Sequence, residues 1–439
     1  MQKSEWKKEE YHDYARSMFD PSKVREKPEL LKGVRVLEVA TALNGPMVSC
    51  FMAELGAEVI KFELPPGNRQ NLPMGGDTIR YAGSRKHEIK GSNLITFTTA
   101  RNKYHVTLDI TTQKGQEIFK KFALMPDTDV ILENLRAGAM DKWGLGYRHL
   151  NKENPRLIYL ATNGPGQWGP KADMISYDLL AQAYGGKLYA TGFPEDDPKY
   201  PGIPTQSLGI GDTVGAIWGF AAIMAALYYR EKTGEGQFIE FSQIEGLIRI
   251  SDYTLVRYSV FKDIFERRGN KNDVVAPYYV TKCSDGYVII GCGSNKIFHN
   301  LCEAMGKPEL KNDPRFLNNY ERVENQEELM ATIDTWISQY TRDELREIAD
   351  RYSFVCAPVM NAKDICQEPH YRARGSVIDF DDPYYGKMTV SPLPIRFSKT
   401  PPRIKTVAKP IGADNEYIYG KYLGLTGGDL EGLKGEKII

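Results

Sequence analysis

The segment from residue 34 to residue 63 constrains the fold more than any other. Val34-Arg35-Val36-Leu37-Glu38-Val39 is predicted to form a strand, and a helix is predicted to begin at Asn44-Gly45-Pro46, since proline suits the first turn of a helix. Residues 56–63 then form a second strand. Two strands joined through one helix form a βαβ unit, whose strands are parallel. The sequence therefore predicts an α/β protein with a parallel sheet.

The pattern of alternating strands and helices continues along the first half of the chain. Strands are predicted at residues 106–109, 129–134 and 157–160, and a helix at residues 113–122. The first turn lacks the Gly-x-Gly-x-x-Gly motif that lets a dinucleotide pyrophosphate approach the backbone. A nucleotide-dependent dehydrogenase is therefore disfavoured.

Charge and composition exclude several other classes of protein. Lys plus Arg equals Asp plus Glu at 57 each, so no overall field attracts nucleic acid or an anionic membrane. The longest apolar run, residues 216–229, is shorter than the roughly 20 residues of a membrane span and predicts a buried helix. The six cysteines and six histidines form no Cys-x-x-Cys or His-x-x-x-His pair, so we expect no metal site. The first residues lack a signal-peptide core, which predicts a cytoplasmic protein.

A glycine-rich loop and a carboxylate follow the strand at residues 157–160. The strand ends at Thr162-Asn163-Gly164, and Asp178 stands where the next helix begins. Ligands of parallel sheets bind beyond the carboxyl ends of the strands, so Asp178 is a candidate for chemistry. Aspartate is also a common helix N-cap, and this second interpretation stays open.

Several motifs together resemble the family III CoA-transferases, which include enzymes acting on formyl-CoA with oxalate, on carnitine-type betaines, on bile acids and on benzylsuccinates. The resemblance extends over roughly residues 31–433. It is carried by the following segments: Asn44-Gly45-Pro46, residues 55–63, Arg101-Asn102-Lys103, residues 134–138, residues 164–170, Tyr177-Asp178 and residues 183–186.

The resemblance implies a Rossmann-like large domain with a parallel sheet, a smaller α+β domain, and an interlocked dimer. The expected domains are an N-terminal extension at residues 1–30, a large CoA-binding α/β domain at residues 31–235 and 400–439, a linker helix at residues 236–270, a small α+β domain at residues 271–355 and an extended linker at residues 356–399. Residues 65–93 are expected to form a surface excursion near the cofactor.

The resemblance also implies site residues. Asp178 is the expected catalytic residue, and Asp212, in Gly211-Asp212-Thr213-Val214-Gly215 ahead of a long apolar helix, is interpreted as an N-cap. The residues expected to contact CoA are Asn44, Leu64, Arg101, Lys103, Asn134, Leu135, Arg136, Lys142 and Trp143. Leu64 departs from the basic residue that is frequent in relatives, and Leu135 replaces a phenylalanine.

The implied activity is transfer of CoA from an acyl-CoA such as succinyl-CoA to a carboxylic acid, through an aspartyl anhydride and an aspartyl-CoA thioester. The backbone amides of residues 164–166, or of the helix start at Asn44-Gly45, are candidate oxyanion donors. CoA is a substrate, and no permanently bound cofactor or metal is expected. The acceptor is expected to be a bulky acid, aromatic or dicarboxylic.

Three alternatives remain at this point. A 2-methylacyl-CoA racemase would share the fold, but relatives of that branch have His where this chain has Tyr177. The chain could be a non-catalytic partner subunit of a heteromeric CoA-transferase, or a nucleotide-binding α/β protein without acyl chemistry. The expected partners are acyl-CoA and acid substrates and either a second copy or a related subunit.

Overall fold

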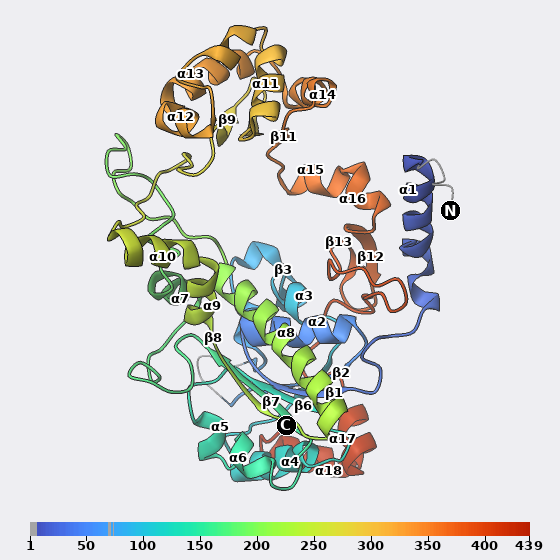
Figure 1. Ribbon diagram of the computed structural model, residues 1–439. Helices are drawn as coiled ribbons and strands as arrows, with labels where there is room; N and C mark the ends of the chain where they lie inside the picture. Colours follow the sequence, from blue (N-terminus) through green and yellow to red (C-terminus); the bar gives the residue numbers. More distant parts are fainter. Residues whose placement is uncertain (1–6, 69–71, 73) are drawn as a thin grey trace. The chain divides into compact units, whose positions relative to one another are not determined.

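The computed structural model describes residues 7–68, 72 and 74–439. It divides the chain into two compact units (Figure 1). One unit comprises the residues up to Leu188 together with Gln206–Ile264 and Pro369–Ile439, and the other comprises Tyr189–Thr205 and Phe265–Glu368.

A six-stranded parallel sheet forms the centre of the first unit, as the sequence predicts. Its order is β5-β2-β1-β6-β7-β8. The strands are β1 (Arg35–Val39), β2 (Glu58–Glu63), β5 (Tyr104–Thr107), β6 (Val130–Glu133), β7 (Ile158–Asn163) and β8 (Phe238–Ser242). Because β2 and β6 flank β1 on opposite sides, the strand order reverses there, which is where parallel sheets open a crevice. Residues 236–270 are expected to form a linker helix, but the first part of this segment is the strand β8, which belongs to the sheet.

Helices cover both faces of the sheet (Figure 1). Successive residues of β1 point to opposite faces, so Val36 packs with α2 (Asn44–Glu54) and α8 (Ile210–Thr233) in one core, whereas Leu37 packs with α4 (Gln113–Ala123) in the other. The last two helices, α17 (Asn415–Leu423) and α18 (Gly427–Gly435), return to the α4 face. Each β1 residue is buried because both faces are covered.

The helix α8 is more exposed than the sequence predicts. It packs on α2, β7 and β8, but only 33% of its most apolar window is buried, which corrects the expectation of a buried helix. It is long and apolar enough to cross a membrane by length and composition alone, a weak signal that a core helix of a soluble protein also gives. The following helices are α9 (Gln243–Ile250) and α10 (Asp252–Phe261), and no residue of α10 is buried.

Short elements complete the first unit. The segment 65–93 carries η2 (Thr78–Tyr81), η3 (Arg85–His87), β3 (Glu88–Ile89) and β4 (Ser92–Asn93). The others are α1 (Lys8–Met18), η1 (Pro21–Glu26), α3 (Thr96–Thr99), α5 (Ala139–Lys142), α6 (Tyr147–Leu150), α7 (Asp178–Tyr184), α16 (Pro369–Ala373), β12 (Ile378–Asp382) and β13 (Gly386–Val390).

The second unit is a small α+β fold with its own hydrophobic core. A hairpin forms β9 (Tyr278–Lys282) and β10 (Tyr287–Gly291), and β11 (Cys356–Pro358) adds a third antiparallel strand in the order β11-β10-β9. Its helices are α11 (Asn295–Ala304), η4 (Pro308–Asn312), α12 (Asn319–Glu324), α13 (Gln326–Ile337), α14 (Arg342–Tyr352) and α15 (Ala362–Gln367).

Candidate active site

A pocket of about 220 Å³ opens beyond the carboxyl ends of β1, β6 and β7. Its walls are the turn at residues 41–44 after β1, residues 134–136 after β6, residues 162–165 at the end of β7, Ala172 and residues 174–177. Asp212 from α8 and Gln243 from α9 complete the lining. The predicted crevice at the reversal of strand order is therefore a real cavity. Among the residues that the structure describes, Arg136 and Asp212 are the charged side chains that line it.

Asp178 lies beside this pocket and is held by three hydrogen bonds. Its Oδ1 accepts the backbone N–H of Gly211 at 2.7 Å and that of Asp212 at 3.1 Å, and its Oδ2 accepts Gln182 Nε2 at 2.6 Å. Asp178 is the first residue of α7 but does not cap that helix. Its carboxylate instead satisfies the free amides at the start of α8, where the helix dipole also favours a negative charge.

Asp212 is the carboxylate that reaches the pocket. Its Oδ1 accepts Gln243 Nε2 at 2.6 Å, and within the described part of the chain no donor bonds to its Oδ2. Burial, and next the negative charge of Asp178, raise the pKa of Asp212 to about 6, while the Gln243 bond opposes this. A partly buried carboxylate of raised pKa in a cleft is a candidate for chemistry. The sequence signal for it, an Asp ahead of a long apolar helix, predicts only an N-cap.

Asn44 joins the pocket wall to α8. Its Nδ2 donates to the backbone oxygen of Asp212 at 3.1 Å, and its Oδ1 accepts Thr162 Oγ1 at 2.9 Å. The contact with α8 requires a glycine, because a Cβ at Gly215 would lie 2.1 Å from Asn44 Nδ2. The buried Asn44 therefore helps to place Asp212 and the start of α2 in one wall.

The turn between β1 and α2 is held in an unusual conformation. Ala42 has a φ of 63°, in the left-handed region that disfavours residues with a Cβ. Its N–H donates to Asp77 Oδ1 at 2.9 Å, and the neighbouring Thr41 exchanges both of its backbone hydrogen bonds with the side chain of Asn134. Asp77 belongs to the segment 65–93, so this surface excursion supports the pocket wall.

The other predicted CoA contacts divide into groups. Asn44, Asn134, Leu135 and Arg136 line the 220 Å³ pocket. Leu64, Leu135 and Trp143 line an adjoining pocket of about 160 Å³, which shares Thr41 and Leu135 with the first. Lys142 is exposed and lines neither pocket. Thr41 and Leu135 therefore separate two neighbouring pockets that both contain predicted CoA contacts.

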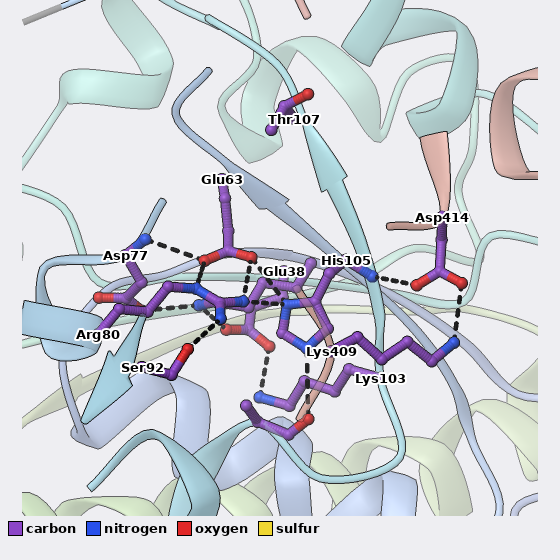
Figure 2. Close-up of polar contacts among 12 residues, drawn as sticks. Glu38, Glu63, Asp77, Arg80, Ser92, Lys103, His105, Thr107, Lys409 and Asp414 are labelled. Atoms are coloured by element: carbon purple, nitrogen blue, oxygen red, sulfur yellow. Dashed lines mark hydrogen bonds and ion pairs between the residues drawn. The ribbon is translucent and has the colours of Figure 1, made fainter. Parts of the chain in front are cut away.

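The structure corrects the predictions for Arg101 and Lys103. Arg101 is buried and its Nη1 pairs with Glu54 at 3.1 Å and donates to the backbone oxygen of Ser391 at 2.7 Å. Lys103 Nζ pairs with Glu38 at 2.7 Å, and its side chain has no exposed surface (Figure 2). Both cations neutralise buried carboxylates inside the protein, which leaves them unable to contact a polyphosphate.

Figure 2 shows the network to which Lys103 belongs. Glu38 also pairs with Lys61, and Lys61 pairs with Asp77 at 2.8 Å. Lysine charges beside Glu38 lower its pKa to about 2 even though burial alone would raise it. This network therefore connects the sheet to the Asp77 side chain that holds Ala42.

One of the predicted sources of oxyanion donors is already engaged. The N–H of Gly166 donates to Asn163 Oδ1 at 2.6 Å, so this amide of the loop after β7 already has an acceptor. The start of α2 faces the pocket through Leu43 and Asn44. Helix N-termini present free N–H groups, which makes this second source the suitable one.

Comparison with known proteins adds independent evidence. The family model described as CoA-transferase family III matches residues 31–415. The chain is 36% identical over 413 residues to the succinyl-CoA–D-citramalate CoA-transferase of Chloroflexus aurantiacus, covering 94% of this chain and 98% of that protein. It is 31% identical over 412 residues to the succinyl-CoA–L-malate CoA-transferase beta subunit of the same organism, covering 93% and 98%. A crystal structure of a CAIB/BAIF family protein from Brucella suis is similar with a TM-score of 0.77 at 30% identity, covering 90% of this chain and 99% of that chain.

Proposed function

Because the chain belongs to CoA-transferase family III and is a CoA-transferase, we propose that it moves CoA from succinyl-CoA to a dicarboxylic acid, with Asp212 as the attacking carboxylate. The observation that carries this proposal is the position of Asp212, whose Oδ2 is free of donors in the described structure and whose side chain lines the pocket. Asp178, the residue predicted from the sequence, is instead engaged by three donors.

The proposed reaction transfers no net proton. A carboxylate oxygen of Asp212 attacks the thioester carbonyl, the C–S bond breaks, and CoA leaves as a thiolate that takes the bonding electron pair. The thiolate attacks the aspartyl carbonyl of the mixed anhydride and releases succinate, which leaves an aspartyl-CoA thioester. The acceptor carboxylate repeats these steps in reverse order, and the last attack by thiolate restores the Asp212 carboxylate.

The surrounding groups suit these steps. The free N–H groups at the start of α2 would stabilise the oxyanion of each tetrahedral intermediate. A pKa of about 6 leaves Asp212 mainly ionised at pH 7 and more basic than an ordinary carboxylate, so it is a better nucleophile. The pantetheine arm would lie along Leu135 towards the pocket that Leu64 and Trp143 line.

A dicarboxylic acceptor is supported by two observations. The similar proteins from Chloroflexus are named for D-citramalate and L-malate. Arg136 lines the same pocket as Asp212, and a guanidinium can bind a carboxylate or a phosphate through two hydrogen bonds. Comparison of D-citramalate, L-malate, glutarate and phenylacetate as acceptors with succinyl-CoA would identify the preferred class.

Trapping the aspartyl thioester tests the choice of nucleophile. The full-length protein is incubated with succinyl-CoA and reduced with borohydride, and the peptides that contain Asp178 and Asp212 are analysed by mass spectrometry. We expect reduction at Asp212 in the wild type and in Asp178→Asn, and none in Asp212→Asn, which should also lose about 10³-fold or more in kcat. Reduction at Asp178 instead would show that Asp178 is the nucleophile, as the family resemblance implies. Absence of label with intact CoA binding would favour a non-catalytic partner subunit.

We also propose that the chain works as a dimer with a second copy. The helix α10 has no buried residue and exposes Tyr258, Val260 and Phe261, and α8 exposes Ile217 and Trp218. Exposed apolar surface of this extent is typical of protein interfaces. Sedimentation of the wild type should give a dimer and Phe261→Glu should weaken it, whereas a monomeric wild type would favour a related second subunit. The cytoplasmic location stays a prediction, which cell fractionation would test.

A further inference from the structure

A separate cavity of about 210 Å³ lies in the first unit, outside the predicted active site. It is enclosed by the N-terminal extension from Phe19 to Lys27, by residues 375–380 around β12, and by the crossing segment at residues 392–404. Residues 19–27 precede the stretch that matches the family, residues 31–415. One wall of this cavity is therefore built by a part of the chain outside that match.

The walls of the cavity are mainly apolar. They include Phe19, Val24, Ile378, Phe380 and Phe397, together with several prolines. An apolar cavity of about 150 Å³ is large enough to hold benzene, so 210 Å³ suits a ligand of about ten non-hydrogen atoms.

Arg396 introduces a positive charge without an acidic partner. Its Nη2 donates to Ser376 Oγ at 2.9 Å, and no carboxylate in the described part of the chain pairs with its guanidinium. Burial, and next the positive charge of Arg374, lower its pKa. A half-buried guanidinium next to another cation is unfavourable unless an anion is bound.

The acids that line the cavity are engaged elsewhere. Asp20 accepts the N–H and the hydroxyl of Ser22, at 2.9 and 2.7 Å. Asp379 pairs with Arg372 at 2.9 Å. The other cations of the lining differ from Arg396, since Lys27 donates to the backbone oxygen of Met18 and Arg403 donates to that of Lys27. Arg25 is exposed at the rim.

We propose that this cavity is a second ligand site, for a small carboxylate with an aromatic or branched aliphatic body. The carboxylate would pair with the Arg396 guanidinium, for which two parallel N–H···O bonds are the preferred geometry. The body would fill the space between Phe19, Ile378 and Phe397. This site does not depend on the proposed CoA transfer, because it shares no lining residue with the active-site pockets.

The probe for this site is 4-fluorophenylacetate, titrated into the full-length protein and followed by fluorine NMR. Saturating CoA is present throughout to occupy the CoA site. The neutral 4-fluorophenylacetamide has the same body without the charge. Arg396→Gln removes the cation and Arg396→Lys keeps a charge there. Arg374→Gln and Arg136→Gln are matched controls, the first beside the cavity and the second in the active-site pocket.

We expect the acid to bind at least tenfold more tightly than the amide. Arg396→Gln should weaken binding of the acid at least tenfold, and Arg396→Lys should retain part of the wild-type affinity. Arg136→Gln should bind the acid as tightly as the wild type does. Arg374→Gln should bind it as tightly as the wild type or up to twofold less tightly. Equal binding of acid and amide, or binding that survives Arg396→Gln, would overturn the proposal. A wild type that binds neither probe, with sedimentation changed by Arg396→Gln, would assign the cavity to an interface between chains and also overturn it.

Discussion

The Oδ1 atom of Asp178 accepts the backbone N–H of Asp212 at 3.1 Å, so two carboxylates meet at the start of α8. The helix amides and Gln182 stabilise the charge on Asp178. The Asp212 carboxylate accepts a hydrogen bond from Gln243 and lines the pocket. Burial together with the Asp178 charge raises the pKa of Asp212 to about 6. One carboxylate therefore positions the helix and raises the basicity of the other.

This arrangement predicts the pH dependence of activity. If ionised Asp212 is the nucleophile, kcat/KM of the wild type should fall below a pH of about 6, with a slope of one in the logarithmic plot. Asp178→Asn removes a neighbouring negative charge, so the pKa of Asp212 should fall and the acid limb should move to lower pH. Gln243→Leu removes a donor and should move it to higher pH. An acid limb that stays in place in both variants would contradict this.

Asp77 is predicted to act as a positioning residue for the turn at Ala42. Asp77→Ala removes the acceptor of the Ala42 N–H and should lower kcat by about tenfold to 10²-fold through misplacement of the pocket wall. Asp77→Asn retains a side-chain oxygen for this N–H but loses the charge pair with Lys61. Both variants should unfold at lower temperature, whereas only Asp77→Ala should lose most of its kcat, measured well below the unfolding transition. An equal loss of kcat in both would show that the role is only structural.

Lys103 is predicted to contribute to stability without binding CoA. Lys103→Met leaves the buried Glu38 with one lysine fewer and should lower the free energy of unfolding by about 3–5 kcal/mol, measured by urea denaturation. The affinity of the folded protein for CoA, measured by calorimetry, should stay within twofold. Arg136→Ala is the comparison, since it lines the pocket and should weaken substrate binding with little effect on stability. If folded Lys103→Met loses affinity for CoA, Lys103 contributes to CoA binding and this prediction is wrong.

The buried carboxyl of Glu133 is predicted to make the stability of the folded protein depend on pH. Burial raises its pKa to about 8, against the single N–H that Leu135 donates. A raised pKa means that the folded protein loses stability as the pH rises from about 4.3, where the unfolded carboxyl ionises, to about 8, by about 1.4 kcal/mol per pH unit at most. Glu133→Gln should remove this dependence. The free energy of unfolding of the variant, measured by denaturant melts, should therefore rise relative to that of the wild type between about pH 4.3 and pH 8, and the difference should stay constant above pH 8. Parallel curves for the two proteins would contradict the assignment.

The local pattern of the sequence determined most of the fold. The strands around Val36, Ile60 and Ile131 and the helix that begins at Asn44 all lie where the sequence predicts them. These elements follow from short-range periodicity and turn chemistry, which neighbouring residues carry. The pocket at the carboxyl ends of the strands follows as well, because parallel sheets open at the reversal of strand order.

Only the tertiary structure decided what the charged residues do. In the sequence Arg101 and Lys103 look like phosphate ligands, but Glu54 and Glu38 pair with them inside the protein. The family resemblance implies that Asp178 is the nucleophile, and the structure adds that its carboxylate accepts backbone amides of α8. Asp212, which looks like a cap, is the carboxylate that faces the pocket. The partners come from 33 to 65 residues away along the chain. Whether a charge is buried, paired or available depends on contacts of this range, and a local sequence pattern does not encode them.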